Sequence, residues 1–220
     1  ATVILPTLSG QRARADDPAF ASTLSWAIRS VLLIAIPATA ALAVLAEPLL
    51  ATLFQYGAFS GDDRAMAAAS LRAYTLGLGA FMLVKALAPG FYAREDMRTP
   101  VRIGIIAMVA NMVLNVAFVF PLMWWLNLGH VGLALATSVS AWLNALLLFR
   151  GLRRDAVLPQ GSLPFKWLVQ VTAATAAMLA ILLWLMPDHA MWAEWLWWQR
   201  AGQLGCLLYT SDAADDDRSV

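Results

Sequence analysis

Five long apolar runs divide this chain, and they constrain its fold more than any other feature. Each is about twenty residues long, the length at which a helix crosses the hydrocarbon core of a bilayer. The runs cover 26–45, 67–91, 101–125, 131–149 and 165–186, and a weaker run follows at 192–208. Every backbone N–H and C=O group must be paired inside lipid, and the alternation expected of barrel strands is absent. The sequence therefore predicts an all-α, polytopic bundle of transmembrane helices.

The composition agrees with a membrane protein. Of the 220 residues, 61% are hydrophobic and only 13% are charged, whereas about 25% of the residues of a soluble domain are charged. The single cysteine, Cys206, excludes an internal disulfide framework and supplies no metal-ligating cluster. Residues 1–8 read as the end of an apolar segment that is already under way, so we expect a fragment of a longer protein. We expect no nucleic-acid partner.

Cations occur in every second connection between the apolar runs. Lysine and arginine are enriched in the cytoplasmic loops of membrane proteins, so we expect these connections to be cytoplasmic. Residues 49–54 follow Glu47 and Pro48 and are too few to span a bilayer, so we expect them to lie along the outer surface. The basic connections contain Arg12 and Arg14, then Arg94, Arg98 and Arg102, and then Arg150, Arg153, Arg154 and Lys166.

Lys85 is the leading candidate for a functional residue. It lies inside the second apolar run, and a lysine at the centre of a membrane helix costs roughly 2.5 to 3.5 kcal/mol, so it usually faces a partner, a wet cavity or a substrate. We expect Lys85 to line a cavity or close a gate, and the alternative is a side chain that reaches the inner headgroups. Arg29 and Arg72 are further candidates for the cavity or gate. The alternatives are a cytoplasmic anchor for Arg29 and contact with lipid headgroups for Arg72.

Three sequence blocks resemble a known family of transporters. The blocks are residues 3–9 (VILPTLS), 53–59 (LFQYGAF) and 85–94 (KALAPGFYAR), the last followed by Thr99-Pro100-Val101. Their sequences and order are similar to the C-terminal half of the MurJ (MviN) lipid II flippase family, in the multidrug, oligosaccharidyl-lipid and polysaccharide exporter superfamily. The resemblance extends from Ala1 to about Gln203.

The resemblance implies an organisation in two lobes followed by two extra membrane helices. Residues 1–150 would form the C-terminal transporter lobe, from the end of the eighth helix to the twelfth. Residues 151–205 would form the two additional helices, the last one truncated. The acidic stretch 206–220 breaks off that last span abruptly, and we expect it to be a disordered, non-native tail.

The resemblance also implies a function. Members of the family move an undecaprenyl-diphosphate-linked disaccharide-pentapeptide across the bacterial inner (cytoplasmic) membrane for peptidoglycan synthesis. Fixed cations would shelter the diphosphate, and rocking of the lobes would give alternating access. Translocation involves no covalent chemistry, so we expect no enzyme and no cofactor other than, at most, a monovalent cation. We expect the full-length protein to be a monomer in contact with membrane lipids.

Asn111, Asn115 and Thr137 form a candidate cation site. Asn111 and Asn115 are spaced i, i+4 and so project from one face of a helix, and Thr137 lies in the neighbouring span. Some members of the resembled family are thought to hold sodium in this lobe with a carboxylate among the ligands, and neither span here offers that carboxylate. The alternative is hydrogen bonding between helices that packs the bundle.

Three other functions stay open from the sequence. A related multidrug or polysaccharide-precursor exporter would share the fold and differ in the lining of its cavity. A membrane enzyme acting on lipid phosphates would need clustered His, Asp or Glu, and the two histidines, His130 and His189, lie in outer loops without such partners. A non-transporting assembly protein would have no need of Lys85 inside the membrane.

Overall fold

The computed structural model describes residues 4–54, 61–126, 128–155, 157–158, 165–185, 202 and 205. Within these residues the regular elements are all helices, which confirms the all-α fold, and the five helices after α1 are long and apolar enough to cross a membrane. In chain order they are α1 (Ile4–Ala13), α2 (Asp17–Phe54), α3 (Gly61–Tyr92), α4 (Arg98–Leu126), α5 (Gly129–Arg154) and α6 (Phe165–Leu185).

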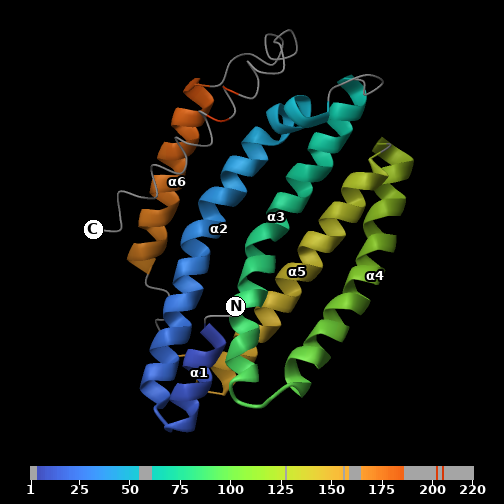
Figure 1. The fold of residues 1–220 in the computed structure, drawn as a ribbon. Coiled ribbons are helices and arrows are strands. Elements are labelled where there is room, and N and C mark those ends of the chain that lie inside the picture. Colours follow the sequence, from blue (N-terminus) through green and yellow to red (C-terminus); the bar gives the residue numbers. More distant parts are fainter. Residues whose placement is uncertain are drawn as a thin grey trace.

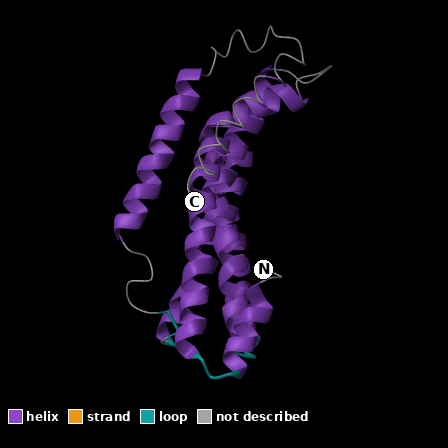
Figure 2. Ribbon diagram, turned by 60° about the vertical axis from the view of Figure 1, so that its left-hand side comes forward, coloured by secondary structure: helices purple, strands orange, loops and turns teal. Residues whose placement is uncertain are grey.

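The long helices stand side by side in an order that differs from their order in the chain. Figure 1 shows α5 between α3 and α4, with α2 on the other side of α3 and α6 beyond α2. Helices α3 and α4 are consecutive in the sequence, yet they barely touch because α5 packs against both. The short helix α1 lies against the lower ends of α2 and α3, and Figure 2 shows the same bundle from the side.

Small residues let α5 approach both of its neighbours closely, as they commonly do where lipid provides no hydrophobic drive for helix association. A Cβ atom on Gly132 of α5 would lie 2.9 Å from the backbone oxygen of Phe118 in α4. On the other side, a Cβ atom on Gly77 of α3 would lie 2.9 Å from the Cα of Ser138. The Ser138 hydroxyl donates a hydrogen bond of 2.7 Å to the carbonyl of Ala73 in α3, which fixes this contact further.

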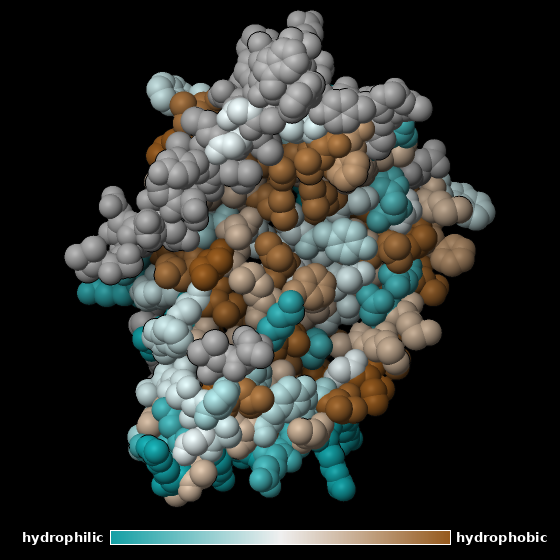
Figure 3. Space-filling view, in the orientation of Figure 1, coloured by the Kyte–Doolittle hydropathy of each residue, from teal (hydrophilic) through white to brown (hydrophobic). Residues whose placement is uncertain are grey.

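The largest apolar core lies at the end of the bundle where α2 begins and α3 and α5 end. Its fully buried side chains come from these three helices and from Leu8 of α1. Hydrophilic residues gather at the same end of the molecule, whereas apolar residues predominate across its middle (Figure 3). The basic connections lie at this end, so the enrichment of lysine and arginine in cytoplasmic loops predicts that it faces the cytoplasm. The core includes Leu24, Ile28, Leu87, Phe91, Leu148 and Leu152.

Residues 49–54, which we expected along the outer surface, are the last turns of α2, which continues without a break through Pro48 to Phe54. Their position relative to the membrane surface stays a prediction. A proline within a helix removes one backbone hydrogen bond and favours a bend, and the last turns of α2 do bend away from the axis of the rest (Figure 1). The hydroxyl of Thr52 donates a 2.7 Å hydrogen bond to the carbonyl of Pro48, within the turn that follows the proline.

The other predicted spans match helices of the structure to within a few residues, except that α2 also begins well before residue 26. Helix α5 continues to Arg154, so the basic linker expected from Arg150 begins only after that residue. The weaker run 192–208 lies almost entirely outside the described residues, and the tail 206–220 lies wholly outside them.

The turn between α3 and α4 contains Asp96, an ionisable residue whose side chain caps the start of α4. A carboxylate oxygen of Asp96 accepts a 3.0 Å hydrogen bond from the backbone N–H of Thr99, at the start of α4. Hydrogen bonds from the side chain and backbone of Thr99 lower the pKa of Asp96 below its ordinary value of 3.8, with smaller contributions from the Arg98 backbone and the Arg94 charge. Because the pKa of Asp96 is lower in the folded chain than in the unfolded chain, its ionised carboxylate stabilises the fold at pH values above the unfolded-state pKa. This stabilisation is lost as the pH falls through the folded-state pKa.

We predict that Asp96→Ala lowers the free energy of unfolding by about 1 kcal/mol at neutral pH, the usual effect of losing such a cap. The difference from the unmodified chain should shrink once the pH falls below the ordinary aspartate pKa of 3.8. Denaturation midpoints measured from about pH 7 down to about pH 3 would check this. The neighbouring change Glu95→Gln serves as the control, and a pH-independent difference for Asp96→Ala would contradict the prediction.

Candidate functional site

The candidate site is a groove between α3, α4 and α5, with a cavity of about 410 Å³. It exists because α3 and α4 both pack on α5 and not on each other. Helix α5 therefore separates the two other walls. The lining residues are Phe81, Val84 and Lys85 from α3, Gly104, Ala107, Met108 and Asn111 from α4, and Thr137, Ser140, Ala141 and Asn144 from α5.

Lys85 is exposed on the wall that α3 forms. It precedes Tyr92, the last residue of α3, by about two helical turns, which places its Cα about 10 Å from the helix end. No hydrogen bond or ion pair joins Lys85 to any residue that the structure describes. Its ammonium is thus a cation inside a membrane-crossing segment, beside a cavity and without a counter-charge in this part of the chain.

The two asparagines of α4 connect to α5 through a short chain of hydrogen bonds. Asn115 Nδ2 donates to Asn111 Oδ1 at 3.1 Å, and Asn111 Nδ2 donates to Ser140 Oγ at 3.2 Å. The Thr137 hydroxyl donates to the carbonyl of Leu133 within its own helix, at 2.9 Å. Asn115 Oδ1 is buried and accepts no hydrogen bond from the described residues. An orphaned buried oxygen is uncommon, so this atom is free to accept a hydrogen bond or to ligate a cation.

Of the three residues predicted as a cation site, the structure brings Asn111 and Thr137 to the same groove as Lys85. The available ligands are neutral carbonyl and hydroxyl oxygens. Among the described residues there is no group of three or more His, Cys, Asp or Glu side chains that could hold a metal ion. The oxygens suit a hard monovalent cation, but they form an incomplete shell without a carboxylate from elsewhere.

Arg72 and Arg29 lie away from the groove. Arg72 precedes Lys85 by thirteen residues in α3, a separation of about 20 Å along the helix. Its guanidinium forms an ion pair of 3.3 Å with Glu47 and donates to the carbonyl of Ala43 at 3.2 Å, so it links α3 to α2. Arg29 is half-buried on α2, and neither arginine belongs to the lining of the groove.

The sequence analysis did not assign Ser140 or Asn144 to the site, although both line the groove with Thr137. The three residues are spaced i, i+3, i+7 in α5, and this spacing places them on one face of a helix. A polar stripe of that kind inside an apolar span is the signal that could have identified them. The remaining lining residues are small or apolar and carry no comparable signal.

Comparison with known proteins identifies the family. Residues 1–198 match the family model described as lipid II flippase MurJ. The chain is 47% identical over 208 residues to a probable lipid II flippase MurJ of Vibrio cholerae, covering 94% of this chain and 38% of that relative. It is 39% identical over 183 residues to the lipid II flippase MurJ of Burkholderia cenocepacia, covering 83% of this chain and 34% of that protein.

The fold agrees with this comparison. A solved structure described as lipid II flippase MurJ in an inward closed conformation superposes with a TM-score of 0.72 at 22% identity, covering 96% of this chain and 41% of that one. The chain thus spans about two-fifths of the relatives that it matches. Its five membrane-crossing helices and its agreement with the family model over most of its length lead to one conclusion. The chain is a multi-pass membrane protein that belongs to the MurJ lipid II flippase family.

Proposed function

We propose that this chain forms one lobe of a flippase for lipid II, and that the groove at Lys85 holds part of the lipid headgroup during translocation. The observation that carries the proposal is the unpartnered cation of Lys85 beside a cavity that Asn111, Thr137, Ser140 and Asn144 line together with apolar residues, in helices long enough to cross a bilayer. Such a cation is costly in an apolar surrounding unless an anion or water meets it. The relatives that this chain matches are named as lipid II flippases.

The chemistry of the substrate fits this groove. The proposed substrate, lipid II, is an undecaprenyl-diphosphate-linked disaccharide-pentapeptide. Its diphosphate and sugars cannot enter hydrocarbon, and its prenyl tail cannot leave it. Lys85 can supply a point charge for a phosphate oxygen. Ser140, Thr137 and Asn144 line the groove with it and can hydrogen-bond to sugar hydroxyls or amides. A lobe that supplies the opposite wall would complete the cavity, and rocking of the two lobes would expose it to each leaflet in turn.

The proposal includes location and reaction class. The protein would lie in the bacterial inner membrane, with the basic helix ends on the cytoplasmic side. It would act as a monomeric transporter and make or break no covalent bond of the substrate. The multidrug and polysaccharide-precursor exporters of the same superfamily remain the alternative, and they would differ in the solute that the groove accepts.

Complementation tests the proposal. The N-terminal lobe of the Vibrio cholerae relative is joined to residues 4–185 of this chain, and the hybrid is expressed in bacteria depleted of their own lipid II flippase. We expect growth and normal cell shape to return, with labelled lipid II reaching the outer leaflet. A hybrid that is inserted and folded, as judged by its elution in detergent, but moves no lipid II would contradict the proposal.

We also propose that sodium binds at Asn115 and Asn111 and completes its shell with an acid from the other lobe. The support is the buried, orphaned Oδ1 of Asn115 next to Asn111. In the hybrid, lipid II transport should be faster in sodium than in potassium, and Asn115→Ala should remove this difference. If Asn115→Ala lowers only the thermal stability and keeps the sodium effect, the two asparagines serve helix packing alone.

A further inference from the structure

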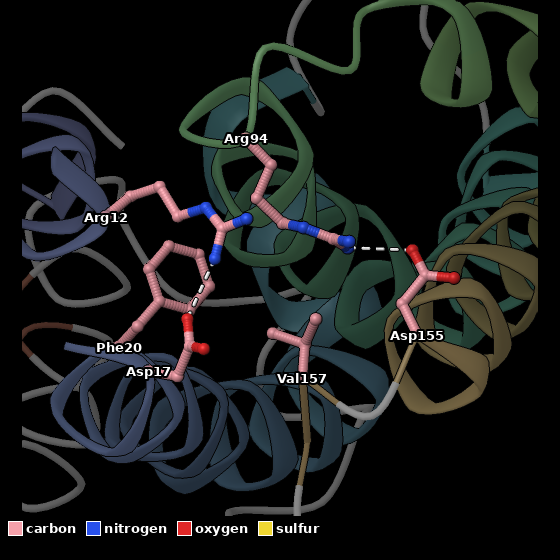
Figure 4. Close-up of a pocket in the computed structure, with 6 residues that line it drawn as sticks. All are labelled: Arg12, Asp17, Phe20, Arg94, Asp155 and Val157. Carbon is pink, nitrogen blue, oxygen red and sulfur yellow. Dashed lines mark hydrogen bonds and ion pairs between the residues drawn. The ribbon is translucent and has the colours of Figure 1, made fainter. Parts of the chain in front are cut away.

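A second cavity, of about 330 Å³, lies at the end of the bundle that carries the basic residues. Four charged side chains from four different parts of the chain line it (Figure 4). Arg12 belongs to the last turn of α1, and Asp17 to the first turn of α2. Arg94 lies in the turn after α3, and Asp155 follows α5. The cavity is thus a junction of segments that are distant in the sequence and is separate from the Lys85 groove.

The charges are arranged as two ion pairs. Arg12 Nη1 lies 2.8 Å from Asp17 Oδ1, and Arg94 Nη1 lies 2.7 Å from Asp155 Oδ2. Figure 4 shows both arginine side chains extending into the same space. A guanidinium carries five N–H donors in a planar fork, and each of the two ion pairs engages one guanidinium nitrogen. Both arginines therefore keep N–H donors that can bind a ligand in the cavity, and each carboxylate can accept further hydrogen bonds.

The balance of charge decides which ligand suits the cavity. Two cations and two anions sum to zero, so the cavity has little attraction for a polyanion such as a diphosphate. A zwitterion fits better because its phosphate can face the arginines while its ammonium faces the aspartates. Phe20, which is buried, and the half-buried Val157 complete the lining and offer apolar surface beside the charges. A cavity of this volume is in the range of small-molecule sites.

We propose that this cavity binds the headgroup of an amine-bearing, zwitterionic phospholipid from the cytoplasmic leaflet. The phosphodiester contacts Arg12 and Arg94, and the ammonium contacts Asp17 and Asp155. Phe20 and Val157 meet the first carbons of the glycerol. The cavity lies where helix ends meet the headgroup layer, and a lipid bound there joins the end of α1 and the start of α2 to the ends of α3 and α5.

The test measures lipid retention by the hybrid of this chain with the N-terminal lobe of the Vibrio cholerae relative. The protein is reconstituted with equal amounts of phosphatidylethanolamine, phosphatidylcholine and phosphatidylglycerol of matched chains, then extracted, and the lipids that remain bound are quantified by mass spectrometry. We expect phosphatidylethanolamine to be retained roughly tenfold over the other two, the scale of one charge-assisted hydrogen bond. Because transport is not the readout, failure here is distinguishable from failure of the flippase assignment.

Variants separate the two ends of the headgroup. Asp155→Asn should remove the preference for the ammonium, so that phosphatidylglycerol is retained as well as phosphatidylethanolamine. Arg94→Gln should lower the retention of all three lipids, and Arg12→Gln provides a second test should Arg94→Gln fail to fold. Arg102→Gln, an exposed arginine of α4 outside the cavity, is the matched control. Stronger retention of phosphatidylglycerol by the unmodified hybrid, an unchanged preference in Asp155→Asn, or equally tight binding of soluble glycerophosphoethanolamine would overturn the proposal.

Discussion

Lys85→Met is expected to reduce lipid II transport by the full-length hybrid roughly 10- to 100-fold, since a charge-assisted hydrogen bond contributes about 1.5 to 3 kcal/mol. Methionine keeps most of the length and the apolar stem of lysine but removes the cation. The groove would then offer the anionic headgroup only neutral polar groups from α4 and α5. The measurement is the rate at which labelled lipid II appears in the outer leaflet, at equal amounts of folded protein.

Two variants make this result specific. Lys85→Arg restores a cation and should recover a large part of the rate. Lys166→Met removes an exposed lysine of α6, far along the chain from the groove, and should leave the rate unchanged. If Lys85→Met transports normally and folds normally, Lys85 only extends toward the inner headgroups, and the groove loses its central role.

The second large effect concerns folding. Gly132→Val should separate α4 from α5, because a Cβ atom at this position meets backbone atoms of Phe118 and Val119 at 2.9 to 3.1 Å. Backbone atoms cannot rotate away as a flexible side chain can, so the two helices must move. Overpacking of this kind typically costs about 1 to 3 kcal/mol. We expect a clear fall in the thermal midpoint of the hybrid in detergent and a lower yield of folded protein.

Gly104→Val is the matched control for this prediction. Gly104 lies within α4, the partner helix of this contact, but a Cβ atom there would have no atom within 4 Å. The variant should therefore keep the thermal midpoint of the unmodified protein. An equal loss of stability in both variants would show that glycine itself, rather than the close contact of α4 with α5, determines the effect.

The five membrane helices of the described residues could be predicted from the sequence, because each apolar run has to satisfy its own backbone within lipid. The continuation of α2 through Pro48 to Phe54 was not predicted, because a proline after an apolar run commonly ends or kinks a helix. A proline removes a single backbone hydrogen bond, and α2 continues with a bend. Apolar length is a strong local signal, whereas the effect of one proline depends on the structure around it.

The site could be predicted only in part. The energetic cost of Lys85 in a membrane pointed to a polar surrounding, and the i, i+4 spacing of Asn111 and Asn115 placed both on one face. The sequence did not indicate that α5 lies between α3 and α4, which is what brings Lys85, Asn111 and Thr137 to one groove. Nor could the ion pair of Arg72 with Glu47 be foreseen, since 25 positions and a change of helix separate the two residues.

The placement of α5 has a consequence for the range of solutes. Since α3 and α4 are held apart by one shared neighbour, the room between them depends on the bulk of a few side chains on that neighbour. Ala141, Ser140 and Thr137 are all compact. Replacing them with larger or smaller residues would change the volume of the groove without changing the walls that α3 and α4 form. The same fold could in this way accommodate headgroups of different size.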